Sequence, residues 1–153
     1  MILPSEVFEL ADRAVLCWLA TADLSGAPNV SPKEAFVLRP PDIALVADIA
    51  SPKSVRNIGM NPGVCLALID VFDQRGYQLH GQAKLVKPRV PAFQDLRATI
   101  EKRIGPGYPI RQVIEVAISR VHSIVAPSYW LDPELPLQDR WRRTVQRYLP
   151  ASE

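Results

Sequence analysis

The sequence has few of the residues that anchor metals, disulfides or membranes. Only two of its 153 residues are cysteine and only two are histidine. Cys17 and Cys65 lie inside apolar runs without the spacing of metal ligands, which indicates buried thiols and no metal site. No window approaches the ~20 apolar residues that a membrane helix needs. The first residues also lack the basic start and long apolar run of a secretory signal, so we expect a cytoplasmic protein.

A strong excess of charge is also absent. Eighteen Lys and Arg residues oppose sixteen Asp and Glu residues, and the net charge of +2 is too weak to predict nucleic acid or a membrane as a partner. The most basic region, residues 139–149, has apolar residues at helical spacing and is interpreted as an amphipathic helix with solvated arginines. His80 and His122 are isolated within strand patterns, which favours ordinary strand residues over metal or haem ligands.

Apolar runs between turn signals predict a mainly β fold in one domain, residues 1–153. A hydrophobic content of 48% and a charged content of 22% are typical of a globular chain. Helices are expected over residues 5–14, 92–103 and 137–149, with a short helix after residue 51. Six strands are expected over residues 15–22, 29–38, 43–48, 64–71, 77–86 and 113–125. In meander order, with helical insertions, these strands suggest an antiparallel barrel that is closed and has no edges.

The segment from Ser51 to Pro62 has the features of an anion site. Ser51 suits the N-cap of a helix, and a proline follows at the first helical position. Lys53, Arg56 and Asn57 follow at helical spacing, so we expect them on one face of the first turns. The unpaired N–H groups, the helix dipole and two cationic side chains would then converge on one bound anion. The alternative is an ordinary capped helix on the surface, because a cap followed by lysine is a common pattern.

The order of motifs along the chain resembles the pyridoxamine 5′-phosphate oxidase-like, FMN-binding split β-barrel family. The motifs that carry the resemblance are Leu19-Ala20-Thr21, Asp23, Gly26, Pro28 to Pro32, Ser51 to Asn57, Asn61-Pro62, Val64, and Leu79 through Gly81 to Ala83. They lie within about residues 14–87, roughly half of the chain. The resemblance implies a six-stranded antiparallel split β-barrel with a short crossover helix and flanking helices. The family-like core would span about residues 14–126.

The resemblance also implies a site for FMN in a groove between the subunits of a homodimer. Lys53 matches the phosphate-binding lysine of the family, and Ser51 and Ser54 would donate hydrogen bonds. Lys33 matches a position that faces the phosphate or the flavin edge, and strand alternation places Ser31 on its face. Trp130 could stack on the flavin of the partner subunit. The candidate cofactor-binding residues are Ser31, Lys33, Ser51, Lys53, Ser54, Arg56, Asn57 and Trp130.

Two departures separate the chain from pyridoxamine phosphate oxidases proper. Pro52-Lys53 stands where those enzymes have a basic pair, and the tail from Tyr129 onward lacks their Arg-x-His segment. The resemblance therefore implies a broader FMN-dependent oxidoreductase that acts on an unknown small molecule or on a nicotinamide nucleotide. A flavin-nucleotide carrier without strong turnover, or a relative that binds a deazaflavin or haem, is the alternative. No catalytic residue can be assigned.

Overall fold

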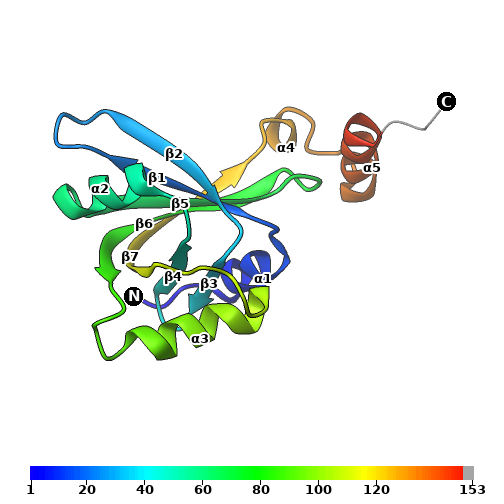
Figure 1. The fold of residues 1–153 in the computed structure, drawn as a ribbon. Helices are drawn as coiled ribbons and strands as arrows, with labels where there is room; N and C mark the ends of the chain where they lie inside the picture. Colours follow the sequence, from blue (N-terminus) through cyan, green and yellow to red (C-terminus); the bar gives the residue numbers. More distant parts are fainter. Residues whose placement is uncertain (150–153) are drawn as a thin grey trace.

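The structure, a computed structural model, describes residues 1–149 as one curled sheet with helices around it. Seven antiparallel strands follow the order β2-β1-β5-β6-β7-β4-β3. They are β1 (Cys17–Ala22), β2 (Pro28–Lys33), β3 (Phe36–Arg39), β4 (Ile43–Asp48), β5 (Gly63–Asp70), β6 (Arg75–Val86) and β7 (Gln112–Val125). In Figure 1 the sheet bends so that β3 and β4 lie below β1 and β2. The result is part of a barrel wall.

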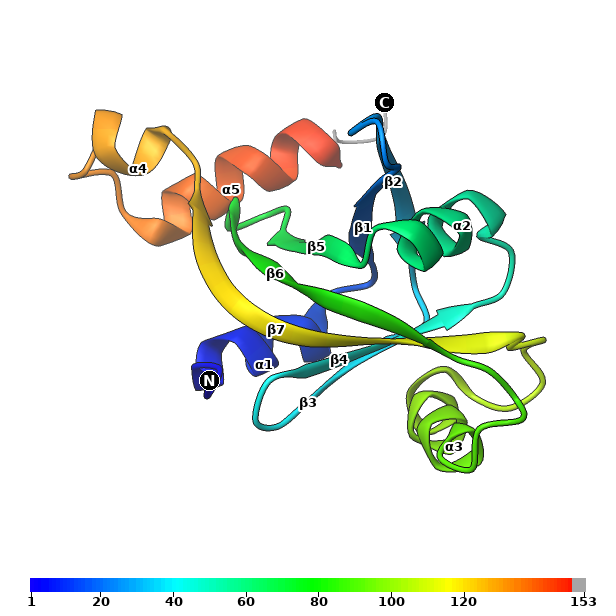
Figure 2. The ribbon, with the colours of Figure 1, turned by 90° about the vertical axis from the view of Figure 1, so that its left-hand side faces the viewer.

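Five helices pack around this sheet. They are α1 (Ser5–Arg13), α2 (Pro52–Met60), α3 (Phe93–Ile104), α4 (Ser128–Leu131) and α5 (Leu137–Tyr148). Helix α2 crosses from β4 to β5 and lies beside the β1–β2 hairpin, whereas α4 and α5 lie at the far end of the molecule (Figures 1 and 2). The sequence predicts α1, α3 and α5 to within one residue at each end, because apolar residues recur at helical spacing in each. The expectation that the arginines of α5 are solvated is wrong for Arg140, which is buried and donates to the carbonyl oxygens of Ser128 and Leu135. Within residues 1–149, no helix combines the length and the apolar character that crossing a membrane requires.

Two hydrophobic cores hold α1, α2 and α3 to the sheet. The larger core fills the inside of the curled sheet and includes the apolar side chains of α1. Leu19, Phe36 and Leu79 are almost fully buried in it. The smaller one lies between α3 and strands β4 and β7, where Leu45 and Ile100 are fully buried. Burial of apolar side chains on this scale is the main force that stabilises such a domain.

The prediction of an antiparallel β fold is confirmed, but the strand count and order differ. The expected strand over residues 29–38 is two strands, because the chain turns sharply at Glu34 and Ala35. The N–H of Phe36 donates to the carbonyl of Glu34 across 3.1 Å in this bend. Strand β2 therefore pairs with β1, and β3 pairs with β4. The expected meander is also wrong, since β1 pairs with β5 and β4 pairs with β7.

The expectation of a closed barrel without edges is wrong as well. Among residues 1–149, no ladder joins β2 to β3, so these strands remain the two edges of the sheet. Long, bent strands β6 and β7 connect the two halves, as Figure 2 shows. The register between them shifts at His80 and Gly81. A Cβ atom at Gly81 would lie 2.2 Å from the carbonyl oxygen of Ala117, so only glycine permits this close approach.

Candidate functional site

A cleft of about 500 Å³ opens at the bend between β2 and β3. Its walls come from Pro32 to Ala35, from Ile49 to Ser51 and from the end of α3, with Ala14, Val15, Ala47 and Tyr108 completing the lining. Lys33 and Ser51 are the two predicted site residues that line the cleft. The structure thus brings the last residue of β2 next to the residue that precedes α2.

Lys33 is a buried amine within this cleft. Its side chain is only 7% exposed, and its Nζ donates a hydrogen bond to Ser51 Oγ. Burial disfavours the ammonium form and lowers the pKa of Lys33 below its usual 10.5, while the nearby Asp48 and Cys17 act in the opposite direction. Ser51 stands at the N-cap position, as expected, but its hydroxyl makes no capping bond to the helix. That hydroxyl accepts the bond from Lys33 instead.

Asp48 organises the start of α2 and was not predicted as a site residue. Its side chain is buried, and Oδ1 accepts the backbone N–H of Ser51 at 3.1 Å. The other oxygen, Oδ2, accepts from Gln112 Nε2 at 2.9 Å. Asp48 thus fixes the backbone turn that aims Ser51 at Lys33. Its position at the end of an ordinary apolar strand gave no sign of this role in the sequence.

Ser31, Ser54 and Asn57 form a polar cluster that attaches α2 to the β1–β2 hairpin. Ser31 Oγ and Ser54 Oγ are 3.1 Å apart, and Asn57 Nδ2 donates to Thr21 Oγ1 at 3.1 Å. Asn29 Nδ2 joins the same cluster by donating to Ser54 Oγ at 3.2 Å. These side chains make hydrogen bonds within the protein, so their contacts with a cofactor stay a prediction. Ser31 and Lys33 both face inward, as strand alternation predicts.

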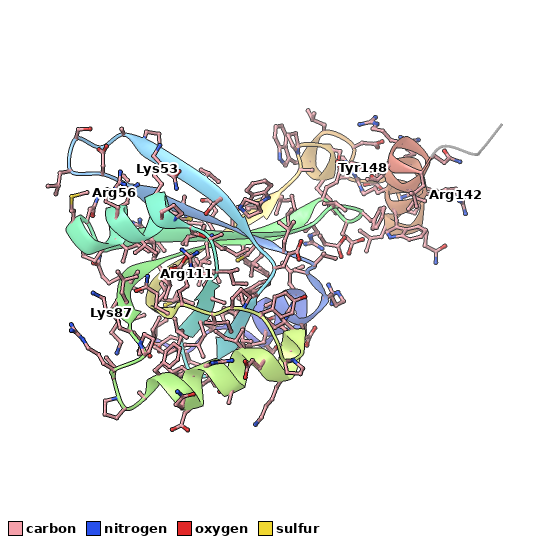
Figure 3. The ribbon with its side chains drawn as sticks, viewed as in Figure 1. Lys53, Arg56, Lys87, Arg111, Arg142 and Tyr148 are labelled. Carbon is pink, nitrogen blue, oxygen red and sulfur yellow. The ribbon has the colours of Figure 1, made fainter. Side chains whose placement is uncertain are left out.

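The other predicted residues lie outside the cleft. Lys53 and Arg56 are exposed on α2, at the end of the molecule opposite Arg142 of α5 (Figure 3). The expectation that Asn57 shares their face is wrong, because Asn57 is buried against β1 whereas both cations are exposed. Trp130 is 66% exposed on α4, and α4 lies far from α2 in both ribbon views. One chain therefore does not bring Trp130 to the cleft.

Two residues of the cleft, Arg103 and Tyr108, were not predicted as site residues. Arg103 donates to the carbonyl oxygens of Ala11 and Ala14 at 2.8 Å, and its guanidinium lies 4.5 Å from the ring centroid of Phe36. These contacts hold the end of α3 against α1 and so form one wall of the cleft. Tyr108 follows α3 and is 45% exposed. No local pattern signals their role, because they reach the cleft only through tertiary packing.

The two histidines meet on the outer face of the sheet. The rings of His80 and His122 are 5.3 Å apart, and His80 Nε2 lies 3.9 Å from Cys65 Sγ. Burial, Arg120 and His122 lower the pKa of His80. Within residues 1–149, no three side chains of the His, Cys, Asp or Glu type are placed to hold a metal ion. We therefore keep the cleft beside α2 as the candidate site.

The family model named pyridoxamine 5′-phosphate oxidase matches residues 3–125, a span that includes the cleft and the polar cluster on α2. The chain belongs to this family. The match ends at the last residue of β7, so α4 and α5 lie outside it. No curated protein matches the chain at a significant level.

Solved structures share the fold at low sequence identity. HupZ from Group A Streptococcus is 21% identical with a TM-score of 0.69, and the match covers 80% of this chain and 94% of that one. An FMN-binding protein from Syntrophomonas wolfei is 13% identical with a TM-score of 0.64, covering 80% and 88% of the two chains. HutZ, the haem storage protein from Vibrio cholerae, is 22% identical with a TM-score of 0.62, covering 82% and 95%. These likenesses establish the split-barrel fold alone.

Proposed function

We propose that this protein binds FMN in the cleft beside α2 and acts as an oxidoreductase on a small molecule. The observation that carries the proposal is the pairing of Lys33 with Ser51 at the start of α2, inside a cleft of about 500 Å³. This volume is within the usual range for sites that bind small molecules. The family resemblance, which implies FMN, and a neighbour named as FMN-binding support the same cofactor.

The residues of the cleft suit the two parts of FMN. The N–H groups of the first turn of α2 have no partner within the helix, and together with the Lys33 ammonium they would hold the phosphate. Small and apolar side chains, among them Val15, Ile49 and Ala50, would contact the flavin ring. Asp48 adds a negative charge beside the phosphate, which Lys33 and the exposed Lys53 would offset. Bound FMN would supply the hydride or electron chemistry, and the chain would orient it and limit its access to water.

The dimer expected from the resemblance is part of the proposal. The cleft opens to solvent at the bend between β2 and β3, so one chain can cover one side of a flavin ring. A second copy would supply the other wall, and a twofold axis would create two equal sites. Exposed Trp18, Val30 and Ile69 on β1, β2 and β5 are apolar side chains that such an interface could bury. Light scattering on the protein with bound flavin quantified tests this point. A monomer that holds FMN tightly would contradict it.

The cofactor is tested by reconstitution. The purified protein is titrated with FMN, FAD, riboflavin, a deazaflavin and haem, and binding is followed by flavin fluorescence or by the haem absorbance. We expect FMN to bind most tightly, at about one per subunit, because the site provides for a terminal phosphate. Equal affinity for riboflavin would refute the phosphate anchor. Preference for the deazaflavin or for haem would establish one of the alternatives.

Turnover separates an oxidoreductase from a carrier. In the FMN-loaded protein, NADH or NADPH should bleach the flavin absorbance under anaerobic conditions, and an added electron acceptor should restore it. A flavin that is bound but is not reduced by either nucleotide would favour the carrier. We also propose a cytoplasmic location, which is supported by the free thiols of Cys17 and Cys65.

A further inference from the structure

Tyr108 differs from the other three tyrosines of the chain in having no partner for its ring. Tyr77 packs against the larger core, and the guanidinium groups of two arginines lie over the ring of Tyr129. The ring of Tyr148 is edge-on to Phe72, with the two centroids 6.3 Å apart. Within residues 1–149, no aromatic ring or guanidinium packs on Tyr108, which lines the cleft. Its ring is therefore available to a molecule that enters the cleft.

Among the lining residues that the structure describes, Tyr108 alone is aromatic. Aliphatic side chains such as Val15 and Ile49 can contact a flat ring, but they lack the π-system that favours offset stacking. Arg103 could also stack on a ring, but its guanidinium already lies over Phe36. Stacking on a flat ligand in this cleft thus depends on Tyr108.

Tyr108 lies in a strap, residues 105–109, that follows α3. Gly105 and Gly107 have φ values of +84° and +98°, a conformation that residues with a Cβ atom rarely adopt. Residues 106–109 make no main-chain hydrogen bond to another helix or strand within residues 1–149. Rotation at the two glycines can therefore adjust the position of the Tyr108 ring without disturbing α3 or the sheet.

The segment after the strap is anchored beside the start of α2. Ile110 is buried in the smaller core, and the Arg111 N–H donates to the carbonyl oxygen of Asp48 at 2.9 Å. The carboxylate of Asp48 accepts the Ser51 N–H at 3.1 Å. One residue thus fixes both the end of the strap and the start of α2, and this places Tyr108 relative to Ser51.

We propose that Tyr108 positions the planar ring of the cofactor by stacking on the ring face that this chain covers. This role rests on the proposed function, because it requires a planar cofactor in the cleft. Tyr108 would contact the ring system alone, so it would contribute equally to the binding of FMN and of riboflavin. Lys33, in contrast, would contribute to the binding of FMN only, through the phosphate.

The variants Tyr108→Leu, Tyr108→Phe and Lys33→Met test this role. Each protein is mixed with FMN or with riboflavin, and free flavin is separated by ultrafiltration, so that the dissociation constant does not depend on fluorescence. Tyr108→Leu should raise the dissociation constants of both flavins roughly 3- to 10-fold, the scale of one aromatic contact, and Tyr108→Phe should leave them near the wild-type values. Lys33→Met should raise the constant for FMN alone. Equal losses in Tyr108→Leu and Tyr108→Phe, or a loss in Tyr108→Leu confined to FMN, would overturn the stacking.

The fluorescence of the bound flavin is a second readout, which a merely structural role of Tyr108 would not change. A stacked tyrosine quenches an excited flavin by reversible electron transfer, so the fluorescence lifetime of bound FMN should lengthen in Tyr108→Leu. It should also lengthen in Tyr108→Phe, because phenylalanine is a poor electron donor. The matched control is Tyr148→Leu on α5, at the end of the molecule opposite α2 (Figure 3), which should leave affinity and lifetime unchanged.

The outcomes distinguish the role of Tyr108 from the identity of the cofactor. Wild-type protein that binds FMN, with the same affinity and lifetime in Tyr108→Leu, would overturn the role of Tyr108 alone. Binding of haem or a deazaflavin in place of FMN, with affinity lost in Tyr108→Leu, would refute FMN alone. A wild-type protein that binds none of these ring systems would overturn both.

Discussion

Replacing Lys33 with methionine should separate ligand binding from stability. Methionine fills nearly the same space without the charge, and Lys33 makes one hydrogen bond, to Ser51 Oγ. Asp48 keeps its bonds to the Ser51 N–H and to Gln112 in the variant. The buried ammonium also carries a desolvation penalty that methionine lacks. We therefore expect the free energy of unfolding to change by less than about 1 kcal/mol.

FMN affinity, by contrast, should fall by about 2–3 kcal/mol, the scale of a lost hydrogen bond between charged groups in a sheltered site. This corresponds to a dissociation constant roughly 30–150 times higher. Flavin fluorescence titration measures the affinity, urea unfolding measures the stability, and Lys87→Met serves as an exposed control on the β6 side of the molecule. A variant that is as stable as the wild type and binds FMN equally well would refute the role of Lys33 in the anion site.

Three further outcomes are expected. Lys53→Ala should weaken FMN binding by about 1 kcal/mol, since Lys53 is exposed and water screens its charge, and fluorescence titration beside Arg56→Ala checks this. Between pH 7 and pH 9 the free energy of unfolding of the wild type should rise relative to Lys33→Met. The pKa of Lys33 is lowered in the native state, so the unfolded chain binds more protons in this range. The range stops at pH 9 because burial raises the pKa of the Cys17 thiol from 9.0 to about 12, and this effect lowers stability at higher pH. Urea titrations at each pH measure the difference, and parallel curves would contradict the lowered pKa. Gly81→Ala should cost more than about 3 kcal/mol, because its Cβ would meet the Ala117 carbonyl oxygen at 2.2 Å, and an unchanged urea midpoint would contradict the close approach.

Local patterns in the sequence were enough to predict α1, α2, α3 and α5 and most strands, whereas α4 was not predicted. The turn before β2 has Gly26 at φ +84°, as the Asp-x-x-Gly pattern predicts. The break between β2 and β3 was missed because residues 33–36 contain no glycine, proline or asparagine that would mark a bend. The buried side chains on its two sides, Lys33 and Phe36, are three residues apart, which interrupts strand alternation, but that burial is set by the fold. The pairing of β1 with β5 also depends on the whole sheet rather than on neighbouring residues.

The candidate site was predictable to the extent that it depends on one segment. Ser51 was predicted from the signals that start a helix and Lys33 from the family resemblance, and the two meet in the cleft. Asn57 was misplaced because helical spacing gives a face but not the direction in which the sheet lies. The cleft wall that Arg103 helps to form, and the burial of Asp48 beside Ser51, depend on contacts between segments that are distant in the sequence. Such contacts require the fold itself.

The two unpaired edges of the sheet make the cleft sensitive to local opening. Strands β2 and β3 are the first and last strands of the sheet, although only Glu34 and Ala35 separate them along the chain. Edge strands open without global unfolding, so their amide hydrogens should exchange with solvent faster than those of the central β6 and β7. A ligand held between Lys33 and Ser51 would connect the end of β2 to the start of α2, next to the bend that leads into β3. Binding of the ligand should therefore slow amide exchange in both edge strands, β2 and β3, and this change can be measured without any assay of catalysis.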